Sequence, residues 1–170
     1  MKSRRPQAII NLNALNHNFF RVKQLAPASK VLAVLKANAY GHGMLAVAQA
    51  LKHADALGVA RIDEALALRA GGITKPIVLL EGFFHPDELQ QVVASNLQLV
   101  IHHREQAAAL LAARLDAPVR VWLKVDSGMH RLGIYPDEFK ELHQCLSQSS
   151  NVQTPIRLMS HFACSDELAN

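Results

Sequence analysis

A lysine ends an apolar run of strand length near the start of the chain: residues 31–43 read VLAVLKANAYGHG, and the lysine is Lys36. Burying an ammonium group costs free energy unless the group is paired or neutralised, and desolvation lowers the pKa of a lysine toward neutrality. Lys36 is therefore a candidate nucleophile or Schiff-base former. The alternative is a lysine whose stem lies along the sheet while its ammonium group reaches water. This stretch alone leaves both interpretations open.

Further side chains that could do chemistry follow the ends of apolar runs. Tyr40 stands four residues after Lys36, Lys124 ends a later run, Arg131 follows in a loop, and His161 comes after the last run. In parallel α/β folds the active-site residues lie at the carboxyl ends of strands, so we expect these side chains at one rim. So cationic a rim favours an anion, such as a phosphorylated cofactor or a carboxylate substrate.

Each of these residues also has an interpretation without a functional role. In an extended segment Lys124 shares its face with Asp126, so the two could form a simple ion pair. Arg131 could face solvent instead of binding a carboxylate in a bidentate pair. His161 could be a hydrogen-bonded core histidine. The residues alone do not decide among these.

The elements that must position these residues alternate along the chain. An amphipathic helix is predicted over residues 12–25, after a short strand at 8–10. Apolar runs then predict strands at residues 31–36, 56–60, 77–80, 97–101, 119–125 and 156–160. Helices are predicted between them, near 44–53, from Asp63-Glu64 to Gly71, from Pro86, over 105–115, and from Pro136 to about Cys145.

Continuous apolar strands that alternate with helices indicate a parallel sheet buried on both faces, and so an α/β fold. Such a sheet either stays open and doubly wound or closes into a (β/α)₈ barrel. The chain holds no G-x-G-x-x-G or G-x-x-x-x-G-K-[ST] motif, which removes the usual nucleotide-binding signals of the open form. Six strands fall short of the eight that a barrel requires. The prediction is an incomplete parallel barrel of about six strands.

Composition excludes several classes of function. The net charge is +4 over 170 residues, but the basic residues form no stripe with interleaved aromatics, so nucleic acid is not an expected partner. The nine histidines show no metal-ligand spacing, and we expect no metal. Cys145 and Cys164 stand far apart, as in a reduced cytoplasmic protein. Arg4-Arg5 precede too short an apolar segment for a signal peptide, and no run is long enough to span a membrane.

Three motifs resemble bacterial alanine racemase, a family that depends on pyridoxal 5′-phosphate. They are AVLKANAYGHG at 33–43, KVDSGMHRLG at 124–133 and SHFACSDE at 160–167, and GVARIDEALALRAGG and KPIVLLEGFF add to the similarity in the same order. The resemblance implies a parallel (β/α)₈ barrel of the pyridoxal-phosphate racemase type, followed by a C-terminal β domain. It also implies a cytoplasmic homodimer that interconverts L- and D-alanine and supplies D-alanine for the cell wall.

The resemblance further implies a role for each candidate residue. Lys36 would hold the cofactor as a Schiff base and serve as one of two catalytic bases. Tyr40 would hydrogen-bond the cofactor phosphate, and His161 would lie against the pyridine ring. Arg131 would lie near the phenolic oxygen of the cofactor and bind the substrate carboxylate. Lys124 matches a lysine that is carbamylated in many members of the family and holds this arginine.

The sequence departs from the family in its length, because it stops at Asn170. The last two barrel strands and the C-terminal domain are not in it. With them are missing an arginine that faces the pyridine nitrogen and the second base, a tyrosine of the partner subunit. We therefore expect residues 1–170, as the N-terminal part of the barrel, not to racemise alanine alone. The alternatives are a pyridoxal-phosphate-binding barrel module without turnover, and a structural fragment that folds only with another chain.

Overall fold

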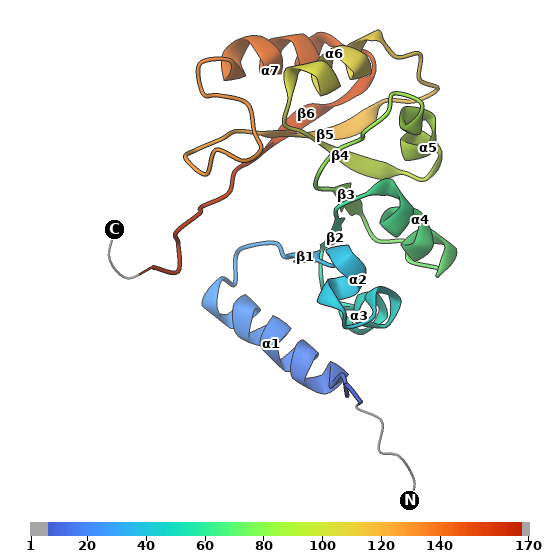
Figure 1. Ribbon diagram of the computed structural model, residues 1–170, viewed down its shortest axis with the longest axis vertical. Helices are drawn as coiled ribbons and strands as arrows, with labels where there is room; N and C mark the ends of the chain where they lie inside the picture. The colour runs from blue at the N-terminus through green and yellow to red at the C-terminus, as the bar shows by residue number, and fades with distance from the viewer. Residues whose placement is uncertain (1–6, 168–170) are drawn as a thin grey trace, which may run out of the picture.

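A six-stranded, all-parallel sheet organises the chain (Figure 1). The computed structural model describes residues 7–167, so the expectation about Arg4-Arg5 lies outside the described residues. The strands are β1 (Leu32–Val34), β2 (Ala56–Val59), β3 (Ile77–Leu79), β4 (Leu97–Ile101), β5 (Val119–Lys124) and β6 (Val152–Met159). The helices are α1 (Leu12–Leu25), α2 (Lys36–Tyr40), α3 (Met44–Ala50), α4 (Ile62–Ala70), α5 (Glu88–Ala94), α6 (Arg104–Ala112) and α7 (Phe139–Gln148).

The strands pair in the order in which they occur in the chain, from β1 at one edge to β6 at the other. Parallel strands need crossover connections, and these are right-handed in nearly all proteins, so sequential order places every crossover helix on the same face. Figure 1 shows α3 to α7 along one side of a strongly twisted sheet, while the opposite side carries no crossover helix. This is the arrangement of a barrel wall, and it confirms the predicted α/β fold with six parallel strands.

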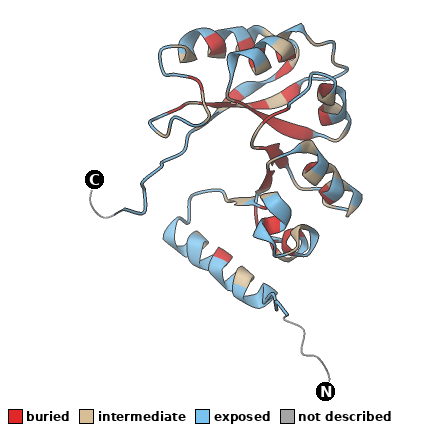
Figure 2. Cartoon of the chain, viewed as in Figure 1, coloured by how far each residue is buried: buried red, intermediate tan, exposed pale blue. Residues whose placement is uncertain are grey.

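The core lies between the sheet and its crossover helices (Figure 2). The central strands β3 and β4 are buried at every position, as their sequences, apolar except for Gln98, predict. Each helix contributes a narrow buried stripe. The stripes consist of Val47 and Ala48 on α3, Ala65 and Leu68 on α4, Leu89 and Val92 on α5, Ala107 and Leu110 on α6, and Leu142 and Leu146 on α7.

Helix α1 begins and ends where the amphipathic pattern predicts. Its N-cap is Asn11, whose side-chain oxygen accepts hydrogen bonds from the backbone N–H groups of Asn13 and Ala14, at 3.0 Å each. Phe19 is its buried residue. Within residues 7–167 no helix is both long and apolar enough to cross a membrane.

Three predicted strands need correction. Residues 8–10 form no strand, because no neighbouring segment among the described residues offers their backbone a ladder. The run at 31–36 is in a strand only as far as Val34, and Lys36 opens α2. Strand β6 begins at Val152 rather than 156, and a register shift opposite Arg120 and Trp122 accommodates its polar first half.

A polar side chain in or beside the first helical turn closes four of the loops that follow strands. Each accepts a hydrogen bond from a backbone N–H group three or four residues earlier, in the manner of an N-terminal capping residue. The pairs are Glu64 with Ala60, Glu88 with Phe84, Gln106 with His102 and Glu138 with Tyr135. These contacts fix the backbone at the end of the sheet where active-site residues are expected.

Candidate functional site

A pocket of about 860 Å³ opens on the face of the sheet that carries no crossover helix. The structure brings all five predicted site residues to its lining: Lys36, Tyr40, Lys124, Arg131 and His161. Its volume lies within the range of small-molecule and cofactor sites, about 300–1,000 Å³. The predicted rim of polar residues is therefore a single site in the structure, built by elements that are far apart in the sequence.

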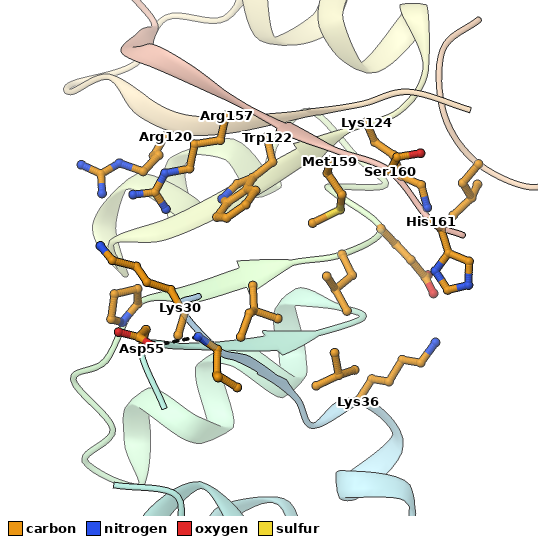
Figure 3. A pocket seen from close by; sticks show the side chains of 18 of the residues that line it. Lys30, Lys36, Asp55, Arg120, Trp122, Lys124, Arg157, Met159, Ser160 and His161 are labelled. Carbon is orange, nitrogen blue, oxygen red and sulfur yellow. Dashed lines mark hydrogen bonds between the residues drawn. The ribbon is translucent and has the colours of Figure 1, made fainter. Parts of the chain in front are cut away.

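The pocket has two ends, which Figure 3 shows. Lys36, Lys124 and His161 lie at the end where the strands terminate. Lys30, Arg120 and Arg157 lie at the other end, with Asp55 beside them and Trp122 between the two groups. Six lysine and arginine residues line the pocket, against the two carboxylates of Asp55 and Glu81. This excess of positive charge favours an anionic guest.

The backbone around Lys36 is unusual. The four residues after it, 37–40, all have φ between 52° and 55°, so α2 is a left-handed turn. Left-handed geometry costs roughly 1–2 kcal/mol for each residue with a Cβ atom, and it persists only where the surroundings determine it fully. Backbone bonds close the turn, among them Ala39 N–H to the Leu35 oxygen at 2.7 Å and Gly41 N–H to the Ala37 oxygen at 3.1 Å. Neither alanine nor tyrosine signals such a turn, so the sequence did not predict it.

Lys124 is the most buried cation of the pocket, with 8% of its surface exposed. Burial lowers the pKa of Lys124, and the neighbouring positive charges of Arg131 and, more weakly, Lys36 lower it further, while Asp126 opposes them. The structure contains no ion pair between Lys124 and Asp126 among the described residues, so the simple pair considered above is not formed. The neutral amine of Lys124 is thus favoured more than in an exposed lysine.

A second polar cluster, formed by Gln98, Trp122 and Arg157, lies at the end of the pocket away from Lys36. The indole N–H of Trp122 donates to the Gln98 side-chain oxygen at 2.8 Å, and Arg157 donates to the same oxygen at 3.2 Å. The Arg157 guanidinium also lies 4.8 Å from the centre of the Trp122 ring, a cation–π contact. The pKa of Arg157 is lowered by burial and by the nearby Arg120. Arg157 is not among the predicted site residues, although Arg157 and Met159, two residues apart in β6, both face the pocket.

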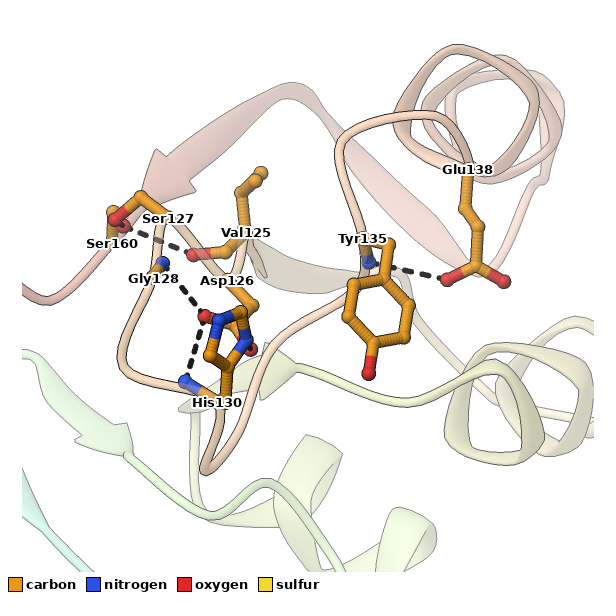
Figure 4. Close-up of polar contacts among 8 residues, drawn as sticks. All are labelled: Val125, Asp126, Ser127, Gly128, His130, Tyr135, Glu138 and Ser160. Atoms are coloured by element: carbon orange, nitrogen blue, oxygen red, sulfur yellow. Dashed lines mark hydrogen bonds and ion pairs between the residues drawn. The ribbon is translucent and has the colours of Figure 1, made fainter.

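Asp126 organises the loop that carries Arg131 (Figure 4). One of its oxygens accepts hydrogen bonds from the backbone N–H groups of Gly128 and His130, at 3.0 Å each, and the other lies 3.2 Å from the His130 ring nitrogen. Ser160, directly after β6, anchors the loop by donating a hydrogen bond to the Val125 oxygen at 3.0 Å. Asp126 therefore fixes the shape of the loop, and it acts on Lys124 through its charge without forming an ion pair.

The loop should open in acid. The two backbone N–H groups lower the pKa of Asp126 below its ordinary value of 3.8, so its ionised form stabilises the folded loop above that pH. This stabilisation is lost as the pH falls through the lowered pKa. We expect the amide signals of Gly128 and His130 to shift in an NMR titration with a midpoint below 3.8, and the shift to be absent in Asp126→Asn. A midpoint at or above 3.8 would contradict this assignment.

The described residues contain no group of three or more histidine, cysteine or carboxylate side chains that could hold a metal ion. The groups gathered in the pocket are instead amines, guanidinium groups and an imidazole. Arg131 and His161 are both exposed at the rim, and Tyr40 is 61% exposed. Such a set can bind a phosphate or carboxylate and offer an amine to a carbonyl carbon.

Known proteins with the same sequence pattern agree on one family. Residues 10–170 match the family described as "Alanine racemase, N-terminal domain". The chain is 57% identical over 161 residues to the alanine racemase of Vibrio cholerae serotype O1, covering 95% of this chain and 45% of that protein. It is 54% identical over 159 residues to the biosynthetic alanine racemase of Escherichia coli K12, covering 94% and 44%.

A solved structure agrees in fold. The crystal structure of biosynthetic alanine racemase from Pseudomonas aeruginosa superimposes with a TM-score of 0.86 and 46% identity, over 91% of this chain and 43% of that one. The chain thus spans less than half the length of the relatives it matches. The chain belongs to the alanine racemase family, through the N-terminal domain of that family.

Proposed function

We propose that the chain forms part of an alanine racemase, a pyridoxal-phosphate-dependent isomerase that interconverts L- and D-alanine, with the cofactor held covalently by Lys36. The observation that carries the proposal is the gathering of Lys36, Tyr40, Lys124, Arg131 and His161 in one cationic pocket, from three separate strand ends. Residues 1–170 would be the N-terminal part of the cofactor-binding barrel.

The residues present fit the cofactor. An amine is needed to bind its aldehyde, cationic and hydroxyl groups are needed to hold its phosphate, and the pocket offers both within about 860 Å³. When bound, pyridoxal phosphate accepts electrons from the substrate and so acidifies the proton on Cα. The protein must then hold the group in place, bind the substrate carboxylate, remove the Cα proton from one face and return a proton to the opposite face.

Each pocket residue has a proposed part in this work. The Lys36 amine, once freed by the substrate, takes or returns the Cα proton on one face. Tyr40 hydrogen-bonds the phosphate, and His161 lies against the pyridine ring. Arg131 binds the substrate carboxylate as a bidentate partner. The base for the opposite face would be a tyrosine that the partner subunit's C-terminal domain supplies in a homodimer.

Lys124 would carry a carbamate, which converts its positive charge into a negative one beside Arg131. The lowered pKa of Lys124 supports this proposal, because only the neutral amine reacts with carbon dioxide. The two cysteines, Cys145 and Cys164, are both free thiols, in keeping with a cytoplasmic enzyme that supplies D-alanine for the cell wall.

A chimaera tests the proposal. Residues 10–167 of this chain would replace the corresponding segment of the Vibrio cholerae enzyme, to which the chain is 57% identical. We expect the chimaera to convert L-alanine into D-alanine, measured by chiral chromatography, and its Lys36→Ala form to lose this turnover. Residues 1–170 alone serve as the control and should form no D-alanine.

Two results would contradict the proposal. A folded chimaera that binds pyridoxal phosphate without turnover would favour the binding module instead. A folded chimaera that binds no cofactor would show that the pocket is not a site for pyridoxal phosphate.

A further inference from the structure

The carboxylate of Glu64 connects two neighbouring units of the fold. One oxygen accepts a hydrogen bond from the backbone N–H of Ala37 at 2.6 Å, 27 residues away in the sequence. The other accepts from the N–H groups of Ala60 at 2.8 Å and Arg61 at 3.3 Å, at the start of α4. Glu64 thus joins the end of β2 to the residue directly after Lys36.

The hydrogen bond from Ala37 to Glu64 gives a partner to a backbone N–H group that the turn itself leaves without one. Ala37 is the first of the four residues with left-handed geometry, and its N–H group lies too early in the turn for an internal partner. Within the turn, the Asn38 side-chain oxygen accepts from the Met44 N–H at 2.8 Å and so ties the turn to the start of α3. Two side-chain acceptors therefore connect the strained turn to its surroundings, and the one that binds next to Lys36 is charged.

Glu64 differs in this respect from Glu88, which occupies a similar place in the next unit. Glu88 accepts from the Phe84 N–H at 3.3 Å, within the loop that leads into its own helix. The contact of Glu64 with Ala37 adds a bond across to the β1 unit. A carboxylate that only capped α4 would not need this third donor.

We propose that Glu64 is a positioning residue for Lys36: its carboxylate fixes the backbone of the left-handed turn and so sets the direction from which the Lys36 amine enters the pocket. The part of this inference that concerns the cofactor rests on the proposed function. The part that concerns the turn rests only on the contacts of Glu64.

The test compares Glu64→Gln with Glu88→Gln in residues 1–170. Both substitutions remove one negative charge from the first turn of a helix and weaken a hydrogen bond to the loop before it, but only Glu64 also contacts Ala37. Hydrogen exchange of the Ala37 amide, followed by NMR or by mass spectrometry of short peptides, reports on the turn directly. We expect exchange at Ala37 to rise about tenfold or more in Glu64→Gln, because a charged hydrogen bond is lost, and to stay unchanged in Glu88→Gln.

A second readout follows Lys36. Pyridoxal phosphate is added, the mixture is reduced with borohydride, and the labelled fraction of Lys36 is read from peptide masses. We expect severalfold less label on Lys36 in Glu64→Gln than in the wild type or in Glu88→Gln. Glu64→Asp, which keeps the charge but is one methylene shorter, should behave like Glu64→Gln and serves where the glutamine variant unfolds.

The outcomes are distinguishable. Unchanged exchange at Ala37 in both Glu64 variants, or an equal rise in Glu88→Gln, overturns the inference. Faster exchange at Ala37 with unchanged labelling of Lys36 also overturns it, because the turn would then not direct the amine. A wild-type chain that shows no selective labelling of Lys36 counts against the proposed function, while the exchange result still decides the role of Glu64 in the turn.

Discussion

Lys36→Ala is expected to abolish selective covalent capture of pyridoxal phosphate. Lys36 stands in a pocket with five other cations, where the positive charge would concentrate a phosphorylated aldehyde. An exposed lysine outside the pocket, such as Lys140 on α7, meets the same aldehyde only at its bulk concentration. Borohydride reduction followed by peptide mapping should therefore place most of the label on the peptide that contains Lys36. In Lys36→Ala the total label should fall at least about tenfold, to the level of non-specific modification.

Lys140→Ala is the matched control, since it removes one lysine without touching the pocket. It should leave the labelled fraction of Lys36 unchanged. Label spread evenly over the exposed lysines of the wild type, or label that persists at wild-type level in Lys36→Ala, would contradict the assignment of Lys36.

Lys124→Met is expected to stabilise the chain in the absence of carbon dioxide. A buried ammonium group without a direct ionic partner is unfavourable, and methionine fills nearly the same volume without charge. We expect the free energy of unfolding near neutral pH to rise by about 1 kcal/mol, at the low end of what replacing buried charges by apolar residues yields. Urea denaturation measures this difference.

The pH dependence of the free energy of unfolding shows whether the charge on Lys124 is unfavourable. Because the pKa of Lys124 in the folded chain lies below its value of 10.5 in the unfolded chain, the unfolded chain binds more protons between the two values. Wild-type stability therefore rises through this window, and the advantage of Lys124→Met narrows as the pH approaches 10.5. A constant difference between neutral and alkaline pH would contradict the unfavourable charge.

The effect of bicarbonate on stability distinguishes a carbamate on Lys124 from a free amine. If Lys124 takes up carbon dioxide, its new negative charge pairs with Arg131, and bicarbonate should stabilise the wild type while leaving Lys124→Met unaffected. An intact-mass measurement under mild conditions should show the added mass of one carbon dioxide in the wild type alone. Equal effects of bicarbonate on both proteins would exclude carbamylation of Lys124.

The sequence predicted the wall of the barrel well because buried parallel strands leave a simple pattern. The run Leu97–Ile101 is apolar except for Gln98, and it is β4 at every residue. The gathering of Lys36, Lys124 and His161 was also predictable, since the carboxyl ends of parallel strands meet at one edge. Their proposed roles came from the resemblance to a family.

Other features leave no local signal. The first half of β6 contains Gln153, Thr154 and Pro155 instead of an apolar run, and it joins the sheet through the pairing of Val152 and Gln153 with β5. Ala37 and Tyr40 disfavour left-handed geometry, so their turn depends on partners that are distant in sequence, such as Glu64. The far end of the pocket was missed because the sequence does not show that Arg157 of β6 comes to lie beside Gln98 of β4 and Trp122 of β5.

Because the strands pair in sequential order, the sheet sets the distance between the pocket residues at its strand ends. Lys36 leaves β1 and Lys124 ends β5, so three strands intervene between the two amines. No hydrogen bond or ion pair links these two side chains among residues 7–167, and the curvature of β2, β3 and β4 sets their separation. Close-packed interiors transmit small changes in volume as strain. A side chain at Gly58 of β2, whose Cβ would approach the pocket-lining Leu32 to 2.7 Å, would therefore press on the wall of the pocket and change its width.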